Sequence, residues 1–416
     1  MKLDSDKTFG ELYPNFEALQ NAVQDVEMKY CEMRSDSLIP LRFLTVLDPQ
    51  PESSEDVIHL RLTRRSEHNP DDDACSYVAV SYTWEQPKGL EAILSVPKYK
   101  IWTSATESHS PYCPPSVLHR ALQYDIQKTK TGRLWIDQEC INQDNTVDRD
   151  EHVTNMHTIY KQSLCTVILL CQYLDSTEAN LLTNFVTMGE QDKLGDFLDQ
   201  NQDIVSQLHD VFKSLLKDPY FTRAWTYQEQ RCSTDACYLV PLNSTATSQH
   251  RDDEGTVAEM LLSQMIIQAC MNYLGRSANP DAVWFYFTIG GLGTTPTRPP
   301  RDTTRNDQHV TTIYTYGPEY ETVRCIHTIE RRHCKYASDR LAILANSSGM
   351  PRTLRTSELR DDPTASFSTC VLALLVMNGL CTGVFPGIMG QTLSRSWRLF
   401  PATFGPSSDE ETQVVM

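Results

Sequence analysis

YVAVSYTW, residues 77–84, is the segment that says most about the fold of this chain. It is rich in β-branched and aromatic residues, and it ends in polar residues followed by Pro87. A short apolar run of this kind is typical of a strand that is buried on both faces. The stretch therefore predicts a central strand, with polar side chains at its carboxyl end.

Two more short strands follow, and each is preceded by a helical pattern. A helix is predicted from Pro115, because Leu118, Leu122 and Ile126 recur at every fourth position. The strand RLWIDQECINQ, residues 133–143, runs to Asp137 and continues as a polar loop. A second helix leads to the strand CTVILL at 165–170. The segment DRDE at 148–151 is predicted to cap this helix, with Asp148 as the acceptor of backbone N–H groups. This alternation predicts a parallel sheet covered by helices, with ligands beyond the carboxyl ends of its strands.

Further elements flank this core. A hairpin or pair of strands is predicted over 41–47 and 57–63, and an amphipathic helix over 204–215. Beyond Cys237 the patterns predict a helix over 257–274, an exposed linker over 294–309 and a last apolar helix over 367–380, capped by Gly379.

Composition excludes several function classes. The 416 residues are 40% hydrophobic and 22% charged, which predicts a soluble globular protein with one large core or two ordinary ones. With 37 basic and 54 acidic residues the net charge is -17, so a nucleic acid is not an expected partner. The thirteen scattered cysteines indicate reduced thiols and a cytoplasmic location. No signal peptide or membrane span is predicted, since the longest apolar run is far shorter than a span requires.

Four segments in this order resemble the fungal heterokaryon incompatibility (HET) domain. They are YVAVSYTW, RLWIDQECINQ, HVTNMHTIYKQS at 152–163, and YFTRAWTYQEQ at 220–230. The chain departs from the family pattern at Glu85, where a glycine usually follows the tryptophan, and at Asn142, where aspartate is frequent. The segment YASDRLAILAN at 336–346 is similar to one found after this domain in many such proteins.

The resemblance implies a domain organisation and a fold. We expect an N-terminal extension with short strands at 1–74, a HET domain at 75–232, a mainly helical region at 233–400 and a disordered tail at 401–416. The HET domain has been likened to the Toll/interleukin-1 receptor (TIR) domain, so the fold class implied is α/β, a TIR-like or flavodoxin-like parallel sheet with flanking helices.

The resemblance also implies candidate site residues. Several TIR domains cleave NAD between nicotinamide and ribose, with a glutamate four residues after a tryptophan as the catalytic acid. Trp225 and Glu229 have this spacing, which places both on one face of a helix. Glu229 is thus the candidate acid, and Tyr82, Trp84 and Trp225 are candidate walls of the substrate pocket. The alternative is that Glu229 pairs with Arg223 or Arg231 and only fastens the helix.

The exit of the second strand supplies two further carboxylates. Asp137 and Glu139 are candidate substrate-binding residues that could hydrogen-bond a ribose or orient a loop, although a helix cap or a turn bond is equally expected for each. Cys140 has no base partner in the sequence, so it is not expected to be a nucleophile.

No metal or cofactor is expected, and NAD is a candidate substrate. The pairs CIH at 325–327 and HC at 333–334 lack the spacing of a structural zinc site, and TIGGLGTT at 288–295 lacks the lysine of a phosphate-binding loop.

Two functions follow from the resemblance. In the family the domain acts in non-self recognition between fused fungal cells and triggers cell death. One hypothesis is an enzyme that hydrolyses NAD, and the other is a non-catalytic signalling module that self-associates and binds protein partners.

Overall fold

The computed structural model describes residues 1–34, 40–47, 57–67, 76–86, 96–189, 201–243, 259–264, 267, 318–381 and 386–391. The chain forms two compact units. One consists of Met1–Ser35 together with Gly290–Met416, and the other of Asp36–Ile289. The predicted linker over 294–309, the glycine-rich stretch at 288–295 and the predicted tail lie outside the described residues.

The unit Asp36–Ile289 is built on a mixed sheet of nine strands. The strands are β2 (Arg42–Val46), β3 (Val57–Arg64), β4 (Val78–Ser81), β5 (Lys98–Trp102), β6 (Ser108–His109), β7 (Leu134–Trp135), β8 (Cys165–Leu169), β9 (Ala236–Pro241) and β10 (Glu259–Ser263). Their order is β10-β9-β8-β4-β7-β2-β3-β5-β6. This arrangement confirms the α/β class.

The predicted parallel core is present at the centre of the sheet. β9, β8, β4 and β7 are parallel to their neighbours in that order. β2 and β3 form the predicted antiparallel pair, and β2 joins the core by pairing with β7. The stretch 77–84 therefore contributes an inner strand, β4, with β7 on one side and β8 on the other.

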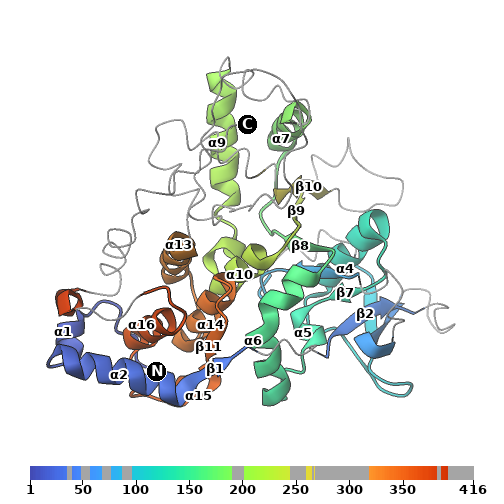
Figure 1. Ribbon diagram of the computed structural model, residues 1–416. Coiled ribbons are helices and arrows are strands. Elements are labelled where there is room, and N and C mark those ends of the chain that lie inside the picture. Colours follow the sequence, from blue (N-terminus) through green and yellow to red (C-terminus); the bar gives the residue numbers. More distant parts are fainter. Residues whose placement is uncertain are drawn as a thin grey trace, which may run out of the picture. The chain divides into compact units, whose positions relative to one another are not determined.

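The helices of this unit connect the strands. They are α4 (Pro115–Tyr124), α5 (Asp137–Cys140), α6 (Thr146–Gln162), α7 (Ser176–Gly189), α9 (Gln202–Leu215) and α10 (Ala224–Cys232), with short helical segments η1 (Arg65–Glu67), η3 (Asp125–Thr129) and η4 (Pro219–Thr222) (Figure 1). The predicted helices from Pro115 and over 204–215 are confirmed.

Helices cover both faces of the sheet. Val78 and Val80 of β4 belong to a buried cluster that includes Val117, Leu118 and Ala121 of α4. Tyr77, directly before β4, and Ala79 of β4 lie in a second cluster with residues of α6, and Trp225 of α10 packs against that cluster. Each face of β4 is thus buried, which accounts for its nearly continuous apolar sequence.

Three local predictions are wrong. Asn145, and not Asp148, caps α6, because its side chain accepts the backbone N–H groups of Val147 and Asp148. The segment after Asp137 is the helical turn α5 instead of a loop. Glu259–Ser263, expected within a helix, pairs antiparallel with β9 as strand β10, so the sheet edge overrides the helical pattern.

The unit formed by both ends of the chain is mainly helical. It contains α1 (Phe9–Leu12), α2 (Phe16–Tyr30), α13 (Pro318–Glu330), α14 (Ala337–Ser347), α15 (Thr356–Asp361), α16 (Phe367–Met377), η6 (Pro386–Gly390) and the antiparallel pair β1 (Cys31–Met33) and β11 (Arg352–Leu354). The predicted apolar helix is α16, which is almost wholly buried, and Gly379 follows it with a φ of 70°. Within the described parts of the chain, no helix has the length and apolarity needed to cross a bilayer.

Candidate functional site

Ser81 is the last residue of β4, and its position follows from the alternation of the strand. Odd-numbered residues Tyr77 and Ala79 face α6 and α10, so Ser81 points to the same side. Its hydroxyl lies 2.5 Å from Oε2 of Glu229 on α10. This contact joins the carboxyl end of the inner strand to the helix that carries the candidate acid.

α10 places Trp225 and Glu229 as the sequence predicts. The helix begins at Ala224, and its first turn is fixed by Thr226, whose hydroxyl donates to the carbonyl oxygens of Tyr220 and Arg223 at 2.5 and 2.9 Å. Trp225 is half-buried against the core, whereas Glu229 is only 7% exposed. The two residues share one face of the helix.

A chain of hydroxyl groups leads from Glu229 to a backbone carbonyl. The Ser81 hydroxyl lies 2.9 Å from the phenol oxygen of Tyr220, and either oxygen could supply the proton. The Tyr220 hydroxyl also lies 3.1 Å from the carbonyl oxygen of Thr226, to which it donates. Asp218 positions Tyr220 by accepting its backbone N–H at 2.9 Å. Ser81 and Tyr220 are therefore part of the immediate surroundings of Glu229.

Burial raises the pKa of Glu229 from its ordinary 4.5 to about 7. The negative charge of Asp137 is the second cause and acts in the same direction. Hydrogen bonding from Ser81, the positive charge of Arg223 and hydrogen bonding from Tyr160 each lower the pKa, but they do not outweigh burial. Glu229 is thus an acid that titrates near neutral pH, as a general acid or base requires.

Asp137 follows β7 at the same edge of the sheet, and two predicted site residues donate to it. The Tyr82 hydroxyl lies 2.8 Å from Oδ1, and the indole Nε1 of Trp84 lies 2.7 Å from Oδ2. Desolvation by burial raises the pKa of Asp137, while the bonds from Trp84 and Tyr82 lower it in part. Tyr82, Trp84 and Asp137 therefore form one hydrogen-bonded group.

Trp84 is the exposed member of this group, with 43% of its surface accessible. The Arg223 guanidinium carbon lies 5.8 Å from the centre of its ring, and Arg223 also donates to the carbonyl oxygen of Tyr82 at 3.2 Å. A flat aromatic surface, a guanidinium and two carboxyl groups are thus combined around the ends of β4 and β7.

Glu139 is turned to a neighbouring loop. Its Oε1 accepts the backbone N–H groups of Tyr112 and Cys113, at 2.5 and 2.8 Å. Its side chain is buried, and desolvation raises its pKa. In the helical turn α5 it is two residues beyond Asp137, which directs it to the 112–113 backbone. This contact gives Glu139 a bracing role; whether it also binds a substrate stays a prediction.

Cys140, next to Glu139, is not poised to act as a nucleophile. Cys140 is fully buried, and burial raises the pKa of its thiol to about 12, which disfavours the thiolate. Over the part of the chain that the structure describes, no three His, Cys, Asp or Glu side chains lie where they could hold a metal ion.

Two members of the site, Ser81 and Tyr220, were not predicted from the sequence. Ser81 stands in the quoted stretch 77–84, and its odd-numbered position was the available signal for a side chain facing α10. Tyr220 opens the quoted segment 220–230, but its contact with Ser81 depends on the turn η4, which brings it back over the helix. Arg223 was expected only as an ion-pair partner of Glu229, whereas it also contacts Trp84 and Tyr82.

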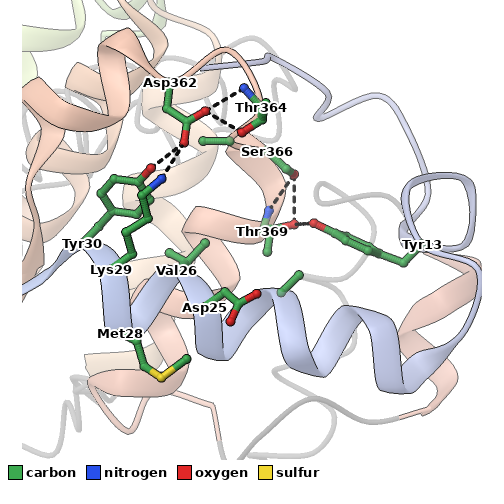
Figure 2. A pocket seen from close by; sticks show the side chains of 12 residues that line it. Tyr13, Asp25, Val26, Met28, Lys29, Tyr30, Asp362, Thr364, Ser366 and Thr369 are labelled. Carbon is green, nitrogen blue, oxygen red and sulfur yellow. Dashed lines mark hydrogen bonds and ion pairs between the residues drawn. The ribbon is translucent and has the colours of Figure 1, made fainter.

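A cavity of about 500 Å³ lies in the other unit, between α2 and the segment that leads into α16 (Figure 2). Its polar side chains largely bond one another: Tyr13 contacts Thr369 at 2.8 Å, and Asp362 accepts from Tyr30 at 2.5 Å and from Lys29 at 3.1 Å. Hydrogen bonds from Thr364 and Tyr30 hold the pKa of Asp362 below its usual range. We therefore place the candidate chemistry at the sheet edge and not in this cavity.

Part of the chain is similar to a known protein family. Residues 77–229 match the family model described as heterokaryon incompatibility protein (HET). The matched segment begins one residue before β4 and ends at Glu229, so it contains both Ser81 and Glu229. No curated protein and no solved structure matches the chain.

Proposed function

We propose that residues 77–229 act as a HET domain, in a heterokaryon incompatibility response that ends in cell death, and that this domain hydrolyses NAD with Glu229 as the catalytic acid. The similarity of this segment to the HET family supports the cellular role. The observation that carries the chemistry is the burial of Glu229 at the carboxyl ends of parallel strands, where burial and the charge of Asp137 raise its pKa to about 7.

The reaction assigns a role to each side chain. Water replaces nicotinamide at the ribose carbon, which gives ADP-ribose, nicotinamide and a proton. As the bond to nicotinamide breaks, positive charge develops on the ribose, and a fixed carboxylate lowers the energy of that state. Glu229 supplies this charge in its ionised form, and it can bond ribose hydroxyls in either form.

The remaining residues hold the substrate. Trp84 presents an exposed ring for stacking and is fixed by its bond to Asp137. Trp225 shares the Glu229 face of α10 and completes the wall. The Arg223 guanidinium beside Trp84 matches the negative charge of the pyrophosphate.

The test is NAD consumption and nicotinamide release by the full chain. Glu229→Gln keeps the volume of the side chain and removes its charge, so turnover should fall by at least about a hundredfold. Glu85→Gln is the matched control, because Glu85 is an exposed acid next to Trp84 and should leave turnover unchanged. Loss of turnover in both variants, or in neither, would contradict the role given to Glu229.

A specific observation favours a second candidate, a signalling module without catalysis. Glu229 is only 7% exposed and its Oε2 is bonded to Ser81, as expected of a residue that fastens α10 to β4. This function predicts no NAD turnover at any protein concentration. It also predicts concentration-dependent assembly that is the same in Glu229→Gln and wild type, measured by sedimentation velocity.

A further inference from the structure

The hydroxyl chain next to Glu229 contains three contacts. They join Glu229 to Ser81 at 2.5 Å, Ser81 to Tyr220 at 2.9 Å, and Tyr220 to the carbonyl oxygen of Thr226 at 3.1 Å. A hydrogen bond needs one proton per contact, and a carbonyl oxygen can only accept. The number of protons in the chain therefore decides how many of the three contacts are hydrogen bonds.

With Glu229 ionised, the chain has too few protons. Ser81 and Tyr220 carry one hydroxyl proton each, so only two of the three contacts can be hydrogen bonds. If Ser81 donates to the carboxylate and Tyr220 donates to Thr226, the oxygen atoms of Ser81 and Tyr220 face each other without a proton between them. In a buried site such a contact is unfavourable.

With Glu229 protonated, each of these three contacts has a proton. The carboxylic acid donates to Ser81, Ser81 donates to Tyr220, and Tyr220 donates to the carbonyl oxygen of Thr226. All three contacts are then hydrogen bonds that point in one direction, from the acid to the backbone. Ser81 can accept a hydrogen bond from the neutral form of Glu229 or donate one to the ionised form. Tyr220 donates its proton to the Thr226 carbonyl, so it can only accept from Ser81, and it therefore distinguishes between the two forms.

We infer that Tyr220 is a positioning residue that acts through Ser81 to favour Glu229 as a neutral acid, with its proton directed at Ser81, and that the Thr226 carbonyl sets the direction of this chain. The inference concerns the place of a proton and stands whether or not NAD is the substrate. It assigns to Tyr220 a function that its burial in the core does not require.

Other charged groups face Glu229 from the neighbouring elements. Asp137, after β7, disfavours the ionised form, whereas Arg223, before α10, favours it. Tyr160 of α6 favours the ionised form by hydrogen bonding. Tyr160 and Tyr220 are therefore expected to act on Glu229 in opposite directions, although each contributes one buried phenol.

The test is a ¹³C NMR titration of the Glu229 carboxyl carbon in the full chain, assigned by its absence in Glu229→Gln. In Tyr220→Phe the neutral acid loses its extra bond, so the pKa of Glu229 should fall by about half a unit to one unit. Tyr160→Phe should raise it. Tyr77→Phe is the matched control: its hydroxyl donates to the carbonyl of Ile159 at 2.5 Å in the same region, and its loss should leave the pKa of Glu229 unchanged.

The sign of the change in the Glu229 pKa in Tyr220→Phe tests the inference. If Tyr220 instead donates to Ser81 in order to support an ionised Glu229, Tyr220→Phe will raise the pKa, and the inference is overturned. An unchanged pKa overturns it as well. Should Tyr220→Phe fail to fold, the infrared band of a protonated carboxylic acid is measured in the wild type below pH 7. The band must be present there and absent in Glu229→Gln, and its absence from both would refute a neutral acid.

Discussion

The Ser81 hydroxyl at the end of β4 lies 2.5 Å from the Glu229 carboxyl on α10, inside the sheet-helix interface. This relationship places an ionisable group where water does not reach it freely. It couples the stability of the fold to the ionisation of a candidate catalytic group, and that coupling can be measured.

Glu229 should make the protein less stable as the pH rises. Its pKa is about 7 when folded and 4.5 is its ordinary value, so the folded state binds the proton more tightly. Its contribution is complete below 4.5 and is lost as the pH passes through 7. Relative to Glu229→Gln, the wild type should lose about 2 to 3 kcal/mol of unfolding free energy over this range, measured by urea denaturation. Parallel curves for the two proteins would show that Glu229 does not titrate in this way.

Asp137→Asn should lower the pKa of Glu229, because it removes the neighbouring negative charge. Arg223→Gln should raise it, since it removes the positive charge that favours the carboxylate. Carboxyl ¹³C titration of the two variants gives both shifts. Shifts of the same sign in both would mean that structural change, and not charge, governs the Glu229 pKa.

The two tryptophans of the proposed substrate wall should differ in their effect on stability. Trp225 packs against the core cluster, so Trp225→Ala should cost about 2 to 4 kcal/mol. Trp84 is 43% exposed and makes one bond to Asp137, so Trp84→Ala should cost about 1 kcal/mol while raising the KM for NAD. Equal losses of stability in urea denaturation would contradict the packing described for these side chains.

Glu139 should behave as a brace for the 112–113 loop. Glu139→Ala leaves two backbone N–H groups without their acceptor and should cost about 1 to 3 kcal/mol. Glu139→Gln retains an oxygen that can accept both bonds, so it should cost less than Glu139→Ala. A substrate-binding role would appear instead as a change in the KM for NAD in Glu139→Gln without a matching loss of stability.

Much of the fold could be predicted because local pattern and tertiary packing agree. β4 is apolar on both faces since α4 covers one and α6 and α10 cover the other, and the run at 77–84 records this directly. The strand β10 was missed because Glu259–Ser263 lies in a helical pattern, and only its pairing with β9 makes it a strand. The spacing of apolar residues within one segment does not show which distant segment it pairs with.

The site could be predicted only where its residues lie close together in the sequence. The spacing of Trp225 and Glu229 is local to one helix, so the sequence contains it. The contact of Glu229 with Ser81 joins residues that are 148 positions apart, and no spacing rule reaches that far. The sequence offered Arg223 or Arg231 as partners of Glu229, but the Glu229 carboxyl group is bonded to the hydroxyl of Ser81.

The role of Glu229 in NAD hydrolysis is tested by measuring nicotinamide release from NAD by the wild type and Glu229→Gln on both sides of pH 7. We predict turnover in the wild type with a pH dependence that changes near 7, where Glu229 titrates, and no turnover in a folded Glu229→Gln. A Glu229→Gln variant as active as the wild type, or no release of nicotinamide by either protein at any pH, would contradict this prediction.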